Sequence, residues 1–141
     1  MKTAKYLVLL GFAGWLLSVA CSTGDGAPPD GLAVAKAEKH VTLRVDFGDG
    51  FEKAYTQLVW IEGMTVGDAM KQASRHRRPT TFEVRGRAAN SLLRQIDDSA
   101  NEGGGGRNWI YRVNDRKGET SFAVFRLAPN DVILWKFETY Q

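Results

Sequence analysis

Few side chains in this sequence have the chemistry of a nucleophile, a general base or a metal ligand. The 141 residues include one cysteine, Cys21, and two histidines, His40 and His76. A nucleophile needs a base within hydrogen-bonding reach, and no motif places either histidine beside one. Two histidines without a cysteine or carboxylate at ligand spacing do not define a zinc site. The sequence therefore favours a protein that is not an enzyme and that has no catalytic residue and no metal centre.

Three carboxylates lie close together in the sequence, at Asp97, Asp98 and Glu102. Carboxylate oxygens bind Ca²⁺, but this segment lacks the alternating oxygen ligands of a calcium-binding loop. We interpret the segment as a plain acidic surface loop.

A group of arginines is the stronger chemical signal. Between residues 75 and 94 the only carboxylate is that of Glu83. The planar guanidinium group suits phosphate and carboxylate recognition. One interpretation is a face that binds anionic lipid head groups, a polyanionic polymer or an acidic partner. The other is an ordinary solvated surface. The arginines are Arg75, Arg77, Arg78, Arg85, Arg87 and Arg94.

Consecutive glycines at positions 103–106 precede Trp109 and Tyr111. The run lacks the lysine and hydroxyl residue of a phosphate-binding loop, which argues against a nucleotide site. Aromatic side chains beside a glycine-rich loop often line a recognition surface, although a tryptophan in a small domain is also typical of the core. Both interpretations stay open. The candidate binding residues are Gly105, Gly106, Trp109, Tyr111, Asn114, Arg75, Arg77 and Arg78.

The first twenty residues have the layout of a secretory signal peptide. Lys2 and Lys5 precede an apolar run over residues 6–17, and the small residues Ser18 and Ala20 lie just before Cys21. This arrangement resembles the lipobox of bacterial lipoproteins, in which the cysteine is acylated, with Ser18 in place of the usual leucine. The sequence predicts a signal peptide over residues 1–20 and an exported lipoprotein, anchored to a membrane through Cys21, that faces the periplasm or the cell exterior. The alternative is ordinary cleavage after Ala20 that leaves a free thiol.

Residues 21–39 are rich in glycine and proline and contain no aromatic residue, which predicts a flexible linker. The leader holds Lys2 and Lys5 and no acidic residue, so its removal lowers the formal net charge from +3 to about +1. So small a charge argues against nucleic-acid binding.

Residues 40–141 are expected to form one domain. Alternation over 40–47 and a β-rich stretch over 51–61, separated by an Asp-Gly turn, predict a hairpin. Thr65 and Asp68 match a capping box, and Val66 opens the apolar face of a helix. Further strands are expected at 80–85, 91–96, 109–113, 121–127 and 132–137, and the last should be central and buried on both faces. This order predicts an α+β fold with a β-grasp-like mixed sheet packed on one helix.

The folded part resembles a known family. The segments at 65–69 (TVGDA), 108–114 (NWIYRVN) and 127–135 (LAPNDVILW) are similar to motifs of the bacterial domain of unknown function 4430, the transcobalamin-like C-terminal domain. Asp115 and Asn130 stand where that family usually has glycine, and both residue types tolerate the left-handed backbone region. The resemblance implies a β-grasp fold and makes cobalamin one candidate ligand. In transcobalamin the ligand lies between this domain and a larger helical one, which is absent here, so corrinoid binding by this chain alone should be weak or need a partner.

Together these features predict a non-catalytic, membrane-anchored interaction module outside the cytoplasm. Its expected partners are the membrane, through the lipid anchor, and an envelope protein or polymer, and no nucleic acid. The alternative is a carrier of a small ligand, such as cobalamin or another corrinoid, that acts beside a larger partner protein.

Overall fold

The computed structural model describes residues 37–140, so the predicted leader, Cys21 and most of the linker lie outside the described residues. None of the helices in this range is long and apolar enough to cross a membrane. The elements are β1 (His40–Asp46), β2 (Glu52–Val59), α1 (Val66–Ser74), β3 (Phe82–Arg85), the 3₁₀ turn η1 (Ala88–Asn90), β4 (Leu92–Ile96), β5 (Ser99–Ala100), β6 (Arg107–Val113), β7 (Arg116–Lys117) and β8 (Val132–Thr139).

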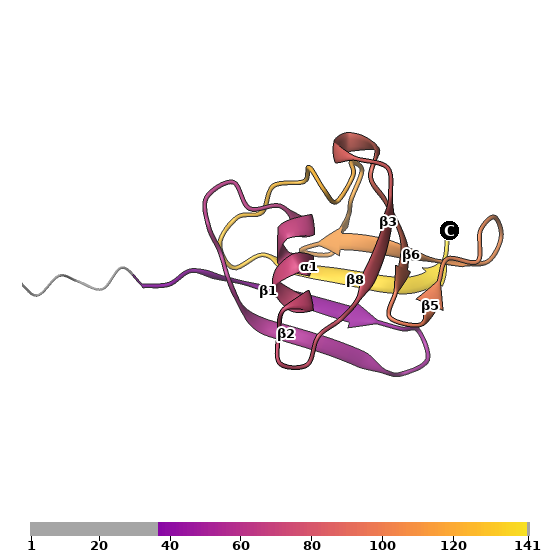
Figure 1. Ribbon diagram of the computed structural model, residues 1–141, viewed down its shortest axis with the longest axis horizontal. Helices are drawn as coiled ribbons and strands as arrows, with labels where there is room; N and C mark the ends of the chain where they lie inside the picture. The colour runs from indigo at the N-terminus through magenta and orange to yellow at the C-terminus, as the bar shows by residue number, and fades with distance from the viewer. Residues whose placement is uncertain (1–36, 141) are drawn as a thin grey trace, which may run out of the picture. The chain divides into compact units, whose positions relative to one another are not determined.

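Two sheets make up the strand framework. The larger has the order β2-β1-β8-β6-β7, in which β1 and β8 run parallel and the other neighbours antiparallel. The smaller has the order β3-β4-β5. Helix α1 lies against the larger sheet over β1 and β2 (Figure 1). The α+β fold with a mixed sheet and one packed helix is therefore confirmed, but the sequence predicts one sheet where the structure has two.

A capping box starts helix α1, as its sequence predicts. The Thr65 hydroxyl accepts a hydrogen bond from the Asp68 N–H at 3.2 Å, and the Asp68 carboxylate accepts one from the Thr65 N–H at 3.1 Å. Burial alone would raise the pKa of Asp68, but hydrogen bonds from Lys71 and Thr65 outweigh it and hold the pKa below its ordinary value. The box satisfies amide groups that a helix start otherwise leaves unpaired.

Replacing Thr65 by alanine should therefore lower the free energy of unfolding by about 1 kcal/mol, the usual cost of losing an N-cap side chain. Thr65→Ser keeps the capping oxygen and is the matched control. Urea denaturation at neutral pH measures both. An alanine variant as stable as the serine variant would show that the cap contributes nothing.

Strand β8 occupies the centre of the larger sheet between β1 and β6, as predicted. Its alternate residues Ile133, Trp135 and Phe137 are buried, while Leu134 and Lys136 are half-buried and Val132 is exposed. The prediction that both of its faces are buried is wrong, because α1 covers only one face of this sheet.

Residues 121–127 do not form the predicted strand. The Ser121 carbonyl accepts hydrogen bonds from the N–H groups of Val124 and Phe125, which closes a turn. The Ser121 hydroxyl donates to the carbonyl of Ser91 at 2.7 Å. Local hydrogen bonds of this kind compete with the hydrogen bonds of a strand. The alternating apolar run therefore folds as a turn, and the Ser121 hydroxyl connects it to the residue just before β4.

Candidate functional site

A cleft of about 500 Å³ lies between β4, β6 and residues 118–122, and we call it the β6 cleft. Its volume falls within the range typical of small-ligand sites, roughly 300–1,000 Å³. Leu92 and Tyr140 stand at its rim with about two thirds of their surface exposed. The aromatic side chains among its lining residues are Trp109, Tyr111, Phe122, Trp135 and Tyr140.

The aromatic floor of the β6 cleft is held in place by packing and hydrogen bonds. The Trp135 ring lies 5.2 Å from that of Tyr111 and 5.5 Å, edge to face, from that of Phe122. The Tyr111 hydroxyl donates to the Thr120 carbonyl. Burial raises the pKa of Tyr111, so this hydroxyl stays protonated at neutral pH. A fixed aromatic floor suits recognition because little side-chain freedom is lost on binding.

Trp135, one of the lining residues, also carries an unsatisfied polar group. The residue is only 2% exposed, and its indole N–H has no hydrogen-bond acceptor within residues 37–140. By contrast, the indole N–H of Trp109 donates to the Ser99 carbonyl at 2.7 Å. A buried unpaired donor costs about 1–3 kcal/mol, and such groups are rare enough in native proteins to need an explanation. The nitrogen is itself buried, so a ligand in the cleft would have to displace neighbouring side chains to reach it.

The Tyr111 ring occupies its place because residue 118 is glycine. A Cβ atom on Gly118 would lie 1.8 Å from Cζ of Tyr111, well inside van der Waals contact. The Gly118 N–H also donates to the Tyr111 carbonyl at 3.0 Å. This glycine therefore shapes the floor of the cleft, although no sequence signal marked it.

Trp109 and Tyr111, both predicted as binding residues, are buried and line the β6 cleft. The two interpretations of Trp109 are thus compatible, because the ring belongs to the core and also forms part of the cleft wall. Gly105 and Gly106 lie in the loop before β6 and are not among the lining residues. Asn108 holds this loop in place, because its side-chain amide donates to the Gly106 carbonyl at 3.0 Å.

Asn114 lies away from the β6 cleft and has a structural role. Its side chain accepts from the Val132 N–H at 2.9 Å and donates to the Asp131 carboxylate at 2.8 Å. The φ angles of Asn114 and Asp115, 50° and 65°, place both in the left-handed region that the β6–β7 turn requires. Asn130, with φ 69°, confirms the same expectation for the turn before β8.

The arginine group does not form one site. Arg77 and Arg78 line a separate groove of about 850 Å³ beside the start of β2, together with Phe51 and Tyr55. Arg75 is exposed at the C-terminal end of α1 and lies outside that lining. The remaining three belong to β3, β4 and the turn between them and line neither cavity: Arg85, Arg87 and Arg94.

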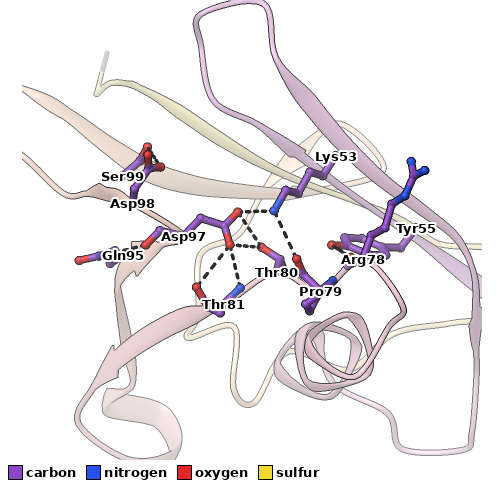
Figure 2. Close-up of polar contacts among 10 residues, drawn as sticks. All are labelled: Lys53, Tyr55, Arg78, Pro79, Thr80, Thr81, Gln95, Asp97, Asp98 and Ser99. Atoms are coloured by element: carbon purple, nitrogen blue, oxygen red, sulfur yellow. Dashed lines mark hydrogen bonds and ion pairs between the residues drawn. The ribbon is translucent and has the colours of Figure 1, made fainter.

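Asp97 is not the plain acidic loop residue that the sequence predicts. Figure 2 shows its carboxylate bonded to Lys53 Nζ, at 2.7 Å, and to the hydroxyl groups of Thr80 and Thr81. It also accepts from the Thr81 N–H at 2.9 Å. Burial would raise the pKa of Asp97, but the bonds from Lys53 and Thr81 outweigh it and lower the pKa. Asp97, which directly follows β4, thereby joins β2 to the segment that precedes β3.

Within residues 37–140, no three His, Cys, Asp or Glu side chains lie close enough together to bind a metal ion. The carboxylate of Asp97 is already occupied by its amine, hydroxyl and amide donors.

Comparison with known proteins finds a similar structure but no match to a family model or a curated protein. The resemblance to the domain of unknown function 4430 is therefore not confirmed. Among solved structures, the chain is similar to a Ruminococcus gnavus protein, known from its crystal structure and provisionally described as metal binding. The two share 13% identity with a TM-score of 0.59, over 74% of this chain and 100% of the other. At this identity the likeness shows the fold alone.

Proposed function

We propose that this protein is a non-catalytic binding module that recognises its partner through the β6 cleft. The observation that carries the proposal is an open cleft of about 500 Å³ whose floor is a cluster of aromatic side chains packed ring against ring. Leu92 and Tyr140 extend apolar surface to the rim, where a ligand would cover it. The lining combines aromatic and aliphatic side chains with polar ones such as Asn101, Asn108 and Ser91, and a mixture of apolar surface and placed polar groups is typical of a recognition site.

The proposal includes export and attachment to a membrane through Cys21. It rests on the order of basic residues, apolar run and small residues before the sole cysteine. Metabolic labelling with a radioactive fatty acid should mark the wild-type chain and not Cys21→Ala. A label that persists in the alanine variant, or that never appears, contradicts the anchor but leaves the cleft untouched.

Site-specific photo-crosslinking tests the cleft itself. A photoreactive phenylalanine analogue placed at Leu92, at the cleft rim, should crosslink to a discrete envelope component in living cells. Ile61 is the matched control, because it is also a large apolar residue, 60% exposed against 66% for Leu92, and does not line the cleft. Equal crosslinking from both positions, or crosslinking from Ile61 alone, would contradict recognition through the β6 cleft.

Titration with cobalamin distinguishes the alternative function, a corrinoid carrier. We expect the corrin absorption to remain unchanged when the full chain is added at micromolar concentration, because one open cleft covers little of so broad a ligand. Binding at micromolar or tighter affinity would favour the corrinoid function instead.

A further inference from the structure

Along the outer edge of β6, two main-chain groups have no hydrogen-bond partner among the described residues. On this edge, away from β8, the Trp109 N–H donates to Asn101 Oδ1 at 2.8 Å, and the Tyr111 carbonyl accepts from the Gly118 N–H at 3.0 Å. Because the N–H and C=O of one strand residue point to the same edge, the Trp109 carbonyl and the Tyr111 N–H face it too. Neither group has a hydrogen-bond partner on that edge within the described part of the chain. Both belong to residues that line the β6 cleft.

Asn101 shows how an added amide group would fit beside β6. Its side-chain amide donates to the Leu93 carbonyl of β4 at 2.7 Å and accepts from the Trp109 N–H of β6 at 2.8 Å. One amide thus bridges β4 and β6 as the peptide group of an intervening strand would. Beyond Asn101, the same edge of β6 continues into the β6 cleft, and no residue between positions 37 and 140 forms such a bridge there until Gly118.

We propose that the β6 cleft binds an extended peptide segment of a partner protein, whose main chain adds to the outer edge of β6 between Asn101 and Gly118. A peptide N–H of the segment donates to the Trp109 carbonyl, and a peptide carbonyl accepts from the Tyr111 N–H. Addition of a strand to an open sheet edge is an established way of recognising peptides. The inference rests on the proposed function and specifies the chemical class of the ligand.

The side chains around this edge indicate which residues the segment carries. The floor is aromatic, and the rim residues Leu92 and Tyr140 are apolar and exposed. Successive side chains of an extended segment point to opposite sides, so the inward-facing residues, every second one, should be apolar. The edge of β2, the other long unpaired edge in the described part of the chain, carries the exposed polar residues Glu52, Thr56 and Gln57 as well as the exposed Val59. The groove beside it is lined by Lys53, Arg77 and Arg78, and these basic side chains make it the less favourable edge for an apolar segment.

A random dodecapeptide library displayed on phage, selected on the full chain in phospholipid nanodiscs, tests the inference. We expect the enriched sequences to alternate apolar and polar residues and to bind Leu92→Glu at least tenfold more weakly than wild type. Ile61→Glu is the matched control and should bind like wild type, because both positions are exposed and tolerate a charge without unfolding. Selection that enriches no sequence on wild type over Leu92→Glu would overturn the inference.

N-methylation of the selected peptide then tests the main-chain bonds. Methylating the one amide nitrogen that donates to the Trp109 carbonyl should weaken binding at least tenfold, whereas methylating its neighbour, which faces away, should have little effect. In ¹⁵N NMR spectra the Tyr111 amide should exchange more slowly with solvent when the peptide is bound. Equal affinity of all methylated forms, or protection confined to amides of β2, would overturn the inference. Persistent crosslinking from Leu92 in that case would leave the proposed function standing.

Discussion

The Gly118→Ala variant is expected to lose about 3 kcal/mol of unfolding free energy, at the upper end of the range for overpacked sites. The new Cβ would lie 1.8 Å from Cζ and 2.3 Å from Cε1 of Tyr111, so the ring must leave its place. The displaced ring loses its hydrogen bond to the Thr120 carbonyl and its packing on Trp135. Chemical denaturation measures the loss, and a thermal melt should show a midpoint lower by roughly 12–15 °C.

Gly104→Ala is the matched control for this prediction. Gly104 lies in the loop before β6, has an ordinary backbone conformation, and a Cβ built on it meets no heavy atom within 4 Å. Its replacement should change stability by less than about 0.5 kcal/mol. If Gly118→Ala proved as stable as Gly104→Ala, the Tyr111 ring could not lie against residue 118 as described, and the shape of the cleft floor would be wrong.

The Asp97→Asn variant should lose about 2 kcal/mol at neutral pH, because it leaves the partly buried amine of Lys53 without its counter-charge. Asparagine tolerates the φ of 48° at this position, so the backbone itself should not be strained. Since the folded-state pKa of Asp97 is lowered, its stabilising contribution is complete above the ordinary carboxyl pKa of about 3.9. That contribution disappears as the pH falls through the lowered value. The difference between wild type and Asp97→Asn should therefore shrink below about pH 4.

Asp98→Asn provides the control, because the neighbouring carboxylate is exposed and bonds only to the hydroxyl of Ser99. Its stability should match wild type at every pH. Unfolding in urea between pH 3 and pH 7 gives both profiles. Two aspartate variants with the same pH profile would contradict the role assigned to Asp97, and a double mutant with Lys53→Met would then show no coupling.

The sequence predicts the framework of the fold well because its signals are local. The alternation over residues 40–47, the Asp-Gly turn and the Thr65 capping box each specify an element through nearby residues, and the structure has all three. The turns at Asp115 and Asn130 also form as expected, since both side chains tolerate a positive φ.

The predictions that are wrong concern residues whose structure depends on contacts with distant parts of the chain. The predicted strand at 121–127 does not form because the Ser121 hydroxyl bonds to the carbonyls of Ala88 and Ser91, which lie 33 and 30 positions earlier. Asp97 pairs with Lys53, forty-four positions away. No local pattern marks such pairs, so the bridging role of Asp97 could not be predicted.

The candidate site was predicted only in part for the same reason. Trp109 and Tyr111 stand out as aromatic residues beside a glycine run, and both line the β6 cleft. Leu92 and Gly118 join them through tertiary packing, which gives no periodic signal. The outer-edge main-chain groups between Trp109 and Tyr111 are unpaired, over the range that the structure describes, because the Asn101 side chain bonds to the strand only at Trp109. The type of residue at position 101 does not predict where its side chain will bond.

The indole N–H signals of the three tryptophans in the described part of the chain test the central claim, recognition through the β6 cleft, most directly. The full chain, labelled with ¹⁵N and held in nanodiscs, is titrated with envelope extract from its own cells. Trp109 and Trp135 line the cleft, whereas Trp60 does not and donates its indole N–H to the Leu127 carbonyl at 2.8 Å. We predict that the Trp109 and Trp135 signals shift while the Trp60 signal stays in place. A shift of Trp60 alone, with the other two unchanged, would contradict recognition through the β6 cleft.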